Sequence, residues 1–231
     1  MKRPATPELR AEWLHRFATM LLSAMDVAWR VEGTFPERGV IVSNHLGYLD
    51  IMVFAAEHRC VFVSKAELAQ VPLLGWMTTM AGTVYVARGS GVSAIRAKSG
   101  LEAAAEAGLP IVIFAEGTTS DGSEILPFRS GALAQVLEAG QSVTAAHVSY
   151  RLTEDNGPGV SVENDVAFWG DDAYLFRHMF GLLALRGIEV TVRFAEKPIE
   201  FVATFHDRKQ AAVEAREAVS ELRGARENVA G

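Results

Sequence analysis

The stretch Ser43-Asn44-His45-Leu46-Gly47-Tyr48-Leu49-Asp50 follows a run of β-branched residues, Val40-Ile41-Val42, that predicts a buried strand. A histidine therefore stands where a strand ends, and a carboxylate follows it closely. Near pH 7 a neutral imidazole can take a proton from a hydroxyl or thiol, while a nearby carboxylate fixes its tautomer. We expect Gly47 to let the backbone bend tightly enough for His45 and Asp50 to meet. The pair alone is a weak signal, because such a spacing also arises by chance.

Strands and helices alternate along the rest of the chain. The predicted strands cover residues 39–43, 61–64, 83–87, 111–114, 143–150, 162–169 and 188–194, with a further short one at 198–201. The predicted helices cover residues 49–57, 66–80 with a break at Val71-Pro72, 93–107, 130–139, 172–186 and 207–223. This alternation predicts an α/β fold, with a largely parallel mixed sheet flanked by helices.

An N-terminal amphipathic helical segment precedes this domain. The run from Trp13 to Trp29 has a broad apolar stripe at helical spacing, but it is short and interrupted by charges, so we predict no membrane span. Two alternatives stay open: a helix packed on the domain, or an interfacial helix, favoured by Trp13, Phe17 and Trp29. We therefore divide the chain into an N-terminal helix (1–32) that is a candidate membrane-surface anchor, a main α/β domain (33–224) and a frayed tail (225–231).

The amino-acid composition of the chain limits the classes of ligand and partner that we expect. The 231 residues are 49% hydrophobic, enough for a full core, and the formal charge of -6 argues against nucleic acid. The single cysteine, Cys60, lies in an apolar run and is expected to be a buried core residue; it cannot form an internal disulfide, which fits a reducing compartment. No group of cysteines and histidines has zinc spacing, so we predict no metal site.

Three further stretches carry groups that can do chemistry at strand ends. Glu116, Gly117 and Thr118 follow an apolar strand; the carboxylate can accept hydrogen bonds from a substrate hydroxyl, and the N–H groups around Gly117 and Thr118 are candidate oxyanion donors. Arg88 ends another strand and can meet a phosphate or carboxylate. Lys65 could supply a cation for an anionic head group. Each is also compatible with an ordinary turn or a solvated surface charge.

The order of these blocks resembles the glycerolipid acyltransferases, the PlsC-like 1-acyl-sn-glycerol-3-phosphate acyltransferase superfamily. The resemblance extends from about residue 39 to residue 150 and, more weakly, to about residue 200. Asn44-His45 with Asp50 matches the first block of the family. The second block matches Gly82 with residues 86–88, and the third matches Phe114, Glu116, Gly117, Thr118 and Ser120.

The resemblance implies roles for these residues. His45 would be the general base that deprotonates the acceptor hydroxyl, and Asp50 would orient it. Arg88, Glu116 and Gly117 would help to hold the acceptor head group, with Lys65 as a further phosphate contact. The acyl group would come from acyl-CoA or acyl carrier protein as co-substrate, with no other cofactor, no metal and no covalent acyl-enzyme.

Departures from the family pattern bear on the acceptor. Thr119 stands where the third block usually has an arginine that is tied to the acceptor phosphate, and Ala115 replaces a proline. Arg129 could substitute for that arginine or be a surface cation. In the degenerate fourth block, His147 is either a core histidine or a second catalytic group.

We expect the acceptor to be the lysolipid 1-acyl-glycerol-3-phosphate, in phospholipid biosynthesis. The alternative is lyso-ornithine lipid or another lysophospholipid, to whose acyltransferases the stretch Phe168-Trp169-Gly170-Asp171 and His178 are also similar. A second alternative is a non-catalytic lipid-binding module. The apolar helix at 172–186 is expected to be core, to line an acyl-chain groove or to touch the bilayer. We expect a peripheral protein on the membrane surface, at the cytoplasmic face of the inner membrane.

Overall fold

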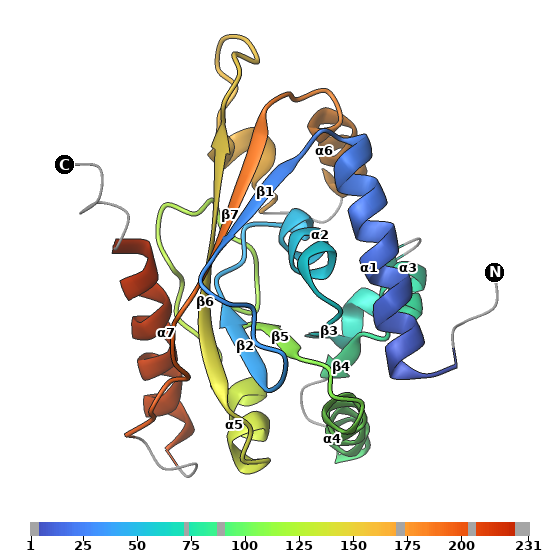
Figure 1. The fold of residues 1–231 in the computed structure, drawn as a ribbon, viewed down its shortest axis with the longest axis vertical. Coiled ribbons are helices and arrows are strands. Elements are labelled where there is room, and N and C mark those ends of the chain that lie inside the picture. Colours follow the sequence, from blue (N-terminus) through green and yellow to red (C-terminus); the bar gives the residue numbers. More distant parts are fainter. Residues whose placement is uncertain (1–4, 72–73, 87–90, 170–173, 203–206, 225–231) are drawn as a thin grey trace.

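The computed structural model describes residues 5–71, 74–86, 91–169, 174–202 and 207–224, which fold around one seven-stranded sheet (Figure 1). The strand order is β1-β7-β6-β2-β5-β3-β4, and all neighbours are parallel except β6 and β7. The bounds are β1 Ala28–Glu32, β2 Val40–Ser43, β3 Val61–Lys65, β4 Val84–Val86, β5 Ile111–Phe114, β6 Val143–Leu152 and β7 Ile188–Phe194. The predicted α/β class and largely parallel mixed sheet are confirmed.

Helices cover both faces of this sheet. They are α1 Pro7–Ala24, α2 Tyr48–Glu57, α3 Leu74–Met80, α4 Gly91–Glu106, α5 Ser130–Glu138, α6 Leu175–Leu182 and α7 Arg208–Gly224, with a 3₁₀ turn, η1 Ala66–Gln70, and a π-helix, η2 Val162–Val166. The predicted break between residues 66 and 80 is confirmed, since η1 ends at Gln70 and α3 begins at Leu74. The residue before a proline disfavours the helical conformation.

Alternating side chains of the central strands feed two separate cores. Ile41 and Val112 point to one face, where they pack with α1 and α2. Val40, Val42 and Ile111 point to the other face, where they pack with α4, α5 and α7. The alternation follows from the two-residue period of a strand. Figure 1 shows α1 and α2 on one side of the sheet, with α5 and α7 on the other.

The N-terminal segment differs from the expected helix over residues 13–29. Helix α1 begins at Pro7, after a Thr6 cap, and ends at Ala24; Asp26 then takes a left-handed conformation (φ 53°) that turns the chain back. Trp29 consequently lies in strand β1, which pairs with β7 and joins residues 28–32 to the sheet. Residues 28–32 are thus part of the sheet rather than of an N-terminal helix.

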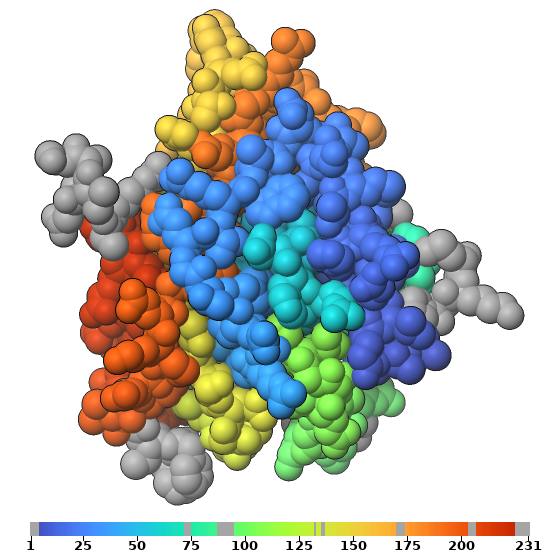
Figure 2. Space-filling model, in the orientation of Figure 1, coloured from blue at the N-terminus to red at the C-terminus, as the bar shows by residue number. Residues whose placement is uncertain are grey.

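Helix α1 packs on the domain. Its residues Leu14, Ala18 and Leu22 are buried in the same core as α2, and Trp13 stacks on Phe17 with ring centroids 5.4 Å apart. On the face in Figure 2, α1 and the segment leading from β1 to β2 lie on either side of α2. Within the described residues, no helix is both long enough and apolar enough to cross a bilayer.

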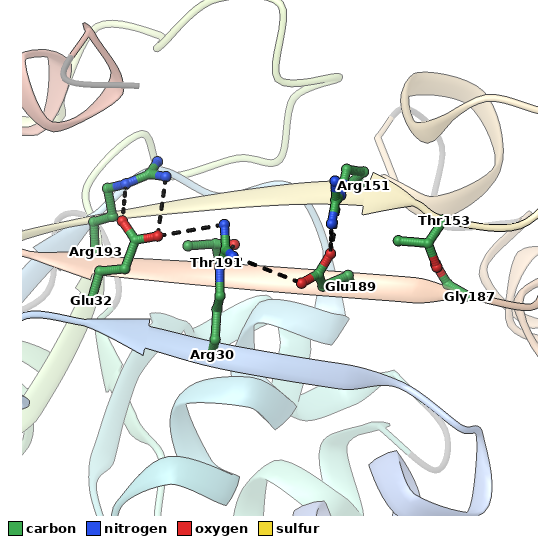
Figure 3. A network of polar contacts seen from close by, with 8 residues as sticks. All are labelled: Arg30, Glu32, Arg151, Thr153, Gly187, Glu189, Thr191 and Arg193. Atoms are coloured by element: carbon green, nitrogen blue, oxygen red, sulfur yellow. Dashed lines mark hydrogen bonds and ion pairs between the residues drawn. The ribbon is translucent and has the colours of Figure 1, made fainter. Parts of the chain in front are cut away.

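A ladder of charged side chains binds the edge strand β1 to β7 and β6 (Figure 3). Glu32 on β1 pairs with Arg193 on β7, and Arg30 donates from Nε to Thr191 Oγ1 at 3.0 Å. Glu189 on β7 continues the ladder to Arg151 on β6. These side chains alternate with the apolar residues that face α1 and α2, so both faces of β1 are stabilised by side-chain contacts.

Two late elements were predicted wrongly. Residues 162–169 were expected to be a strand, but residues 162–166 form η2, where the Ser161 hydroxyl accepts from Asn164 N and the Asp165 carboxylate accepts from Ser161 N. Such local side-chain bonds compete with sheet pairing, and β7 already occupies the place beside β6. Residues 198–201 form no strand; Ile199 makes a single backbone bond to Val143. Helix α6 is also shorter than the predicted 172–186, whose residues 172–173 lie outside the described ranges.

Since α1 packs on the domain, the residues on its buried face should contribute to the free energy of unfolding and those on its exposed face should not. Leu22 is fully buried and Met20 on the same helix is 63% exposed. We expect Leu22→Ala to lower the free energy of unfolding by about 2–5 kcal/mol because it leaves a cavity. The matched control Met20→Ala should stay within about 0.5 kcal/mol. Urea denaturation measures both, and equal effects would contradict the packing of α1.

Candidate active site

The predicted histidine and aspartate lie together at the carboxyl end of β2. His45 Nδ1 donates to Asp50 Oδ2 at 2.7 Å, and the same oxygen accepts from the backbone N–H groups of Leu46 (2.6 Å) and Gly47 (3.1 Å). Asp50 is the third residue of α2, where a carboxylate caps the helix start and meets the positive end of its dipole. The start of α2 therefore brings the carboxylate back toward His45.

A tyrosine on a distant strand completes the environment of Asp50. The Tyr150 hydroxyl, on β6, donates to Asp50 Oδ1. Asp50 is fully buried, and its two oxygens accept from four donors in all. A buried carboxylate is tolerated when its hydrogen-bonding capacity is satisfied in this way. Tyr150 could not be predicted as a partner of Asp50, because only the pairing of β6 beside β2 places it there.

The imidazole of His45 stacks on an aromatic ring and is partly exposed to solvent. Its ring and that of Phe114 are stacked, with centroids 3.9 Å apart and an interplanar angle of 8°. The His45 side chain remains 15% exposed, whereas that of Asp50 is not exposed at all. Since Nδ1 is held by the carboxylate, Nε2 is the nitrogen that can take a proton from a hydroxyl.

Asn44 fixes the backbone just before His45. Its buried amide accepts from Val148 N at 2.8 Å and donates to Val148 O at 3.0 Å. The side chain thus extends the β2–β6 pairing by one step after the last paired residue, Ser43. On the other side, Ser120 N donates to His45 O at 2.9 Å. These contacts hold the histidine backbone between β6 and the loop after β5.

Gly47 is needed for a close approach rather than for a sharp bend. Its φ of 166° is extended backbone that any residue can adopt. A Cβ atom there would, however, lie 3.1 Å from Phe168 N and 3.3 Å from Phe168 Cβ. Phe168 N donates to Leu46 O at 2.8 Å, so the segment after η2 lies directly against the loop that carries His45. The expected reason for this glycine was therefore wrong.

Glu116 is buried beneath the site instead of facing a substrate. It is 1% exposed, and neither carboxyl oxygen has a hydrogen-bond partner in the described part of the chain. Burial raises the pKa of Glu116 to about 8. The charge of Asp50 also raises this pKa, while the nearby N–H groups of Leu126 and His45 lower it without offsetting the effect of burial. The structure therefore does not support its expected role as a direct contact to the acceptor; near pH 7 its protonated form predominates.

The loop after Glu116 also differs from expectation. Gly117 takes a left-handed conformation (φ 67°), and its N–H donates to Phe114 O, so this N–H is not available as the oxyanion donor that we expected. Thr118 is exposed. Arg129 lies next to this turn, because a Cβ on Gly117 would be 3.0 Å from Arg129 Cγ. Arg129 is thus a cation that the fold brings beside the third block.

The remaining predicted residues lie in different places. Lys65 is exposed at the end of β3, where it pairs in register with Val86. Arg88 lies outside the described residues. His147 is buried and points to the opposite sheet face from Tyr150, because the two are an odd number of residues apart on β6. Of the two alternatives for His147, a core histidine or a second catalytic group, its position therefore supports the core histidine. In the described chain no three acidic, histidine or cysteine side chains are grouped to hold a metal ion.

A histidine oriented by a buried carboxylate, at the carboxyl edge of a mostly parallel sheet, is the arrangement of a general base that activates a hydroxyl. The family model described as Acyltransferase matches residues 28–149. The chain therefore belongs to the acyltransferase family.

Similar proteins refine this assignment. The chain is 34% identical to the lyso-ornithine lipid O-acyltransferase of Pseudomonas aeruginosa over 217 residues, covering 94% of this chain and 78% of that protein. It is 31% identical to the 1-acyl-sn-glycerol-3-phosphate acyltransferase of Neisseria meningitidis over 147 residues, covering 62% and 58%. The crystal structure of PlsC from Thermotoga maritima has the same fold, with a TM-score of 0.57, 19% identity, and coverage of 92% and 79%. The chain is a lysolipid O-acyltransferase of the PlsC-like type.

Removal of the Tyr150 hydroxyl should impair the catalytic pair without removing it. We expect Tyr150→Phe to lower the rate of acyl transfer about tenfold, the size of one hydrogen bond to a charged group. Tyr85→Phe is the matched control, because that hydroxyl bonds Thr78 and not the catalytic pair. Steady-state kinetics of both variants test this, and an unchanged rate in Tyr150→Phe would contradict the role of this bond.

Burial of Glu116 should make stability depend on pH. The folded state holds a proton up to about pH 8, while the unfolded carboxyl loses it near its usual pKa of 4.5. Between these values the folded state binds more protons, so the free energy of unfolding should fall as pH rises, by up to about 1.4 kcal/mol per pH unit.

The variant Glu116→Gln keeps the shape and cannot ionise, so it should lose this slope. Urea denaturation of both proteins at two pH values within that range measures the difference. An identical pH dependence of the two would show that Glu116 does not change its protonation on unfolding.

Proposed function

We propose that this chain transfers a fatty acyl group from a thioester to the hydroxyl of a lyso-ornithine lipid. The observation that carries the acyl transfer is the bond from His45 Nδ1 to the buried Asp50 carboxylate. The choice of acceptor is supported by the relative from Pseudomonas aeruginosa, which matches over nearly the whole chain. Thr119, in place of an arginine that would meet a phosphate, also favours an acceptor without a phosphomonoester.

In this reaction His45 Nε2 takes the proton of the acceptor hydroxyl as its oxygen attacks the thioester carbonyl carbon. The tetrahedral intermediate then collapses, the carbon–sulfur bond breaks, and the thiolate leaves with the proton from the imidazolium. The products are the diacylated lipid and a free thiol. The thioester is already activated, so one positioned base does much of the chemical work.

Asp50 has two functions in this scheme. Its bond to Nδ1 keeps the proton on that nitrogen, so that Nε2 presents a lone pair, and its charge stabilises the imidazolium when it forms. Because Asp50 is itself held by backbone donors and by Tyr150, the imidazole should need little reorganisation during the reaction.

The donor and the place of action remain part of the proposal. Either acyl-CoA or acyl carrier protein would supply the thioester. We propose a peripheral protein at the cytoplasmic face of the inner membrane. Association with a membrane surface is supported by large apolar side chains that stay exposed on α6 and just after it: Phe176, Phe180 and Leu183.

An acceptor panel tests this function. Purified protein with acyl-CoA or acyl carrier protein as donor would be offered lyso-ornithine lipid, lysophosphatidic acid or lysophosphatidylcholine, while thiol release is followed. We expect the highest kcat/KM with lyso-ornithine lipid, and a loss of at least about 100-fold in His45→Ala, the size of a general-base contribution.

His58 supplies the matched control: it is half-buried at the other end of α2, where its ring stacks on Phe35, and His58→Ala should leave the rate unchanged. A clear preference for lysophosphatidic acid would overturn the proposed acceptor. Lipid binding without turnover of any acceptor, unaffected by His45→Ala, would instead favour the non-catalytic module.

A further inference from the structure

A cavity of about 420 Å³ opens between η2 and α6, beside the loop that carries His45. Such a volume lies in the range of small-molecule sites. Its walls combine both signs of charge with aromatic rings, and the residues that matter here are Asp165, Phe168, Trp169, Tyr174, Arg177 and His178. None of these residues belongs to the catalytic pair or to the predicted substrate contacts.

Two contacts join the wall of this cavity to the loop that carries His45. Phe168 N donates to Leu46 O at 2.8 Å, and the hydroxyl of Tyr48 lies 3.0 Å from His178 Nδ1. The Tyr48 and Phe168 rings are also neighbours, with centroids 5.9 Å apart. A lipid head group held in the cavity would therefore lie next to the loop whose base acts on its hydroxyl.

The cavity offers a place for an ammonium group. The Asp165 carboxylate uses Oδ2 to accept from Ser161 N, which leaves Oδ1 for a ligand. The rings of Phe168, Trp169 and Tyr174 surround the same space, and Trp169 is fixed by its Nε1, which donates to Glu163 O at 2.8 Å. A carboxylate next to aromatic faces is a suitable environment for a cationic amine.

The cavity also offers a place for a carboxylate. Arg177 on α6 is exposed at its rim, and within the described ranges no salt bridge engages it. Its guanidinium can bind a carboxylate through two parallel hydrogen bonds. The other basic side chain of the wall is His178. Burial lowers the pKa of His178 and so favours its neutral form, although the backbone of Ala167 and the charge of Asp165 act to raise that pKa. Arg177 is thus the positive charge of the cavity.

We propose that this cavity binds the acceptor head group as a zwitterion, with its ammonium at Asp165 among the aromatic rings and its carboxylate at Arg177. The inference rests on the proposed function, since an ornithine acylated at its α-amine keeps a side-chain ammonium and a carboxylate. A phosphomonoester has no ammonium, and its double negative charge would be repelled by Asp165. The cavity would then discriminate between the two acceptors.

Two charge-removing variants and a matched control test the inference. We expect Asp165→Asn and Arg177→Gln each to raise KM for lyso-ornithine lipid by about 10- to 100-fold, with a smaller effect on kcat, as for a hydrogen bond to a charged group. For lysophosphatidic acid, Asp165→Asn should leave KM unchanged or lower it. Asparagine can still accept from Ser161 N, so η2 should persist, and a thermal melt checks this. Glu163→Gln removes the same charge from η2 outside the cavity and should change nothing.

Neutralising the ligand provides the complementary measurement. Acetylation of the ornithine side-chain amine should raise KM in the parent protein and cause no further loss in Asp165→Asn, because the same interaction is already missing. If Asp165→Asn and Arg177→Gln behave like Glu163→Gln with every acceptor, the inference is overturned.

Equilibrium binding separates this inference from the proposed function. The probe is N-hexadecanoyl-ornithine in detergent micelles, which has the head group but no acceptor hydroxyl. Weaker binding by Asp165→Asn and Arg177→Gln than by Glu163→Gln supports the cavity even if lyso-ornithine lipid is not turned over. Turnover of lyso-ornithine lipid by the parent protein, with equal binding by all three variants, would keep the function and refute the cavity.

Discussion

The buried carboxylate of Asp50 is the constraint on which the site depends. An unpaired charge in a protein interior costs several kcal/mol, so its position is fixed by the need for hydrogen-bond donors. Two backbone N–H groups, the His45 ring and the Tyr150 hydroxyl supply them. Satisfying Asp50 requires the loop after β2, the start of α2 and strand β6 to take one arrangement, and that arrangement also orients the histidine.

The sheet makes this arrangement possible by placing β2 between β5 and β6. Asn44 extends β2 toward β6 through both polar groups of Val148, and Phe114 at the end of β5 provides the ring on which His45 lies. The loop after β5 is held from the other side of the molecule, since Arg216 on α7 donates twice to Ile125 O. Elements far apart in the chain thus converge on one imidazole, which needs a fixed orientation to act as a base.

A residue in a sequence motif of an active site can be structural rather than a contact to the substrate. Glu116 follows an apolar strand in the manner of a substrate ligand, yet it is buried under the loop with its pKa raised to about 8. The charged residues that face an open cavity lie elsewhere. Asp165 belongs to the π-helix η2, in a segment that we expected to be a strand. Arg177 belongs to the short helix α6, which we expected to be longer. In our proposal, the function of this fold therefore depends on the segments between β6 and β7 as well as on the strand ends.

The sequence by itself determined the alternation of strands and helices, the break before Pro72 and the His45–Asp50 pair, because periodicity, proline and short spacings act over a few residues. It could not show that Trp29 belongs to an edge strand, that Tyr150 reaches Asp50 or that Glu116 is buried. Those outcomes depend on which strands become neighbours, and that is decided by contacts between segments that lie far apart in the chain, such as Asp50 and Tyr150. Tertiary structure alone also made the cavity beside the loop that carries His45, since its walls meet only when η2 packs on α6 and α6 contacts the start of α2.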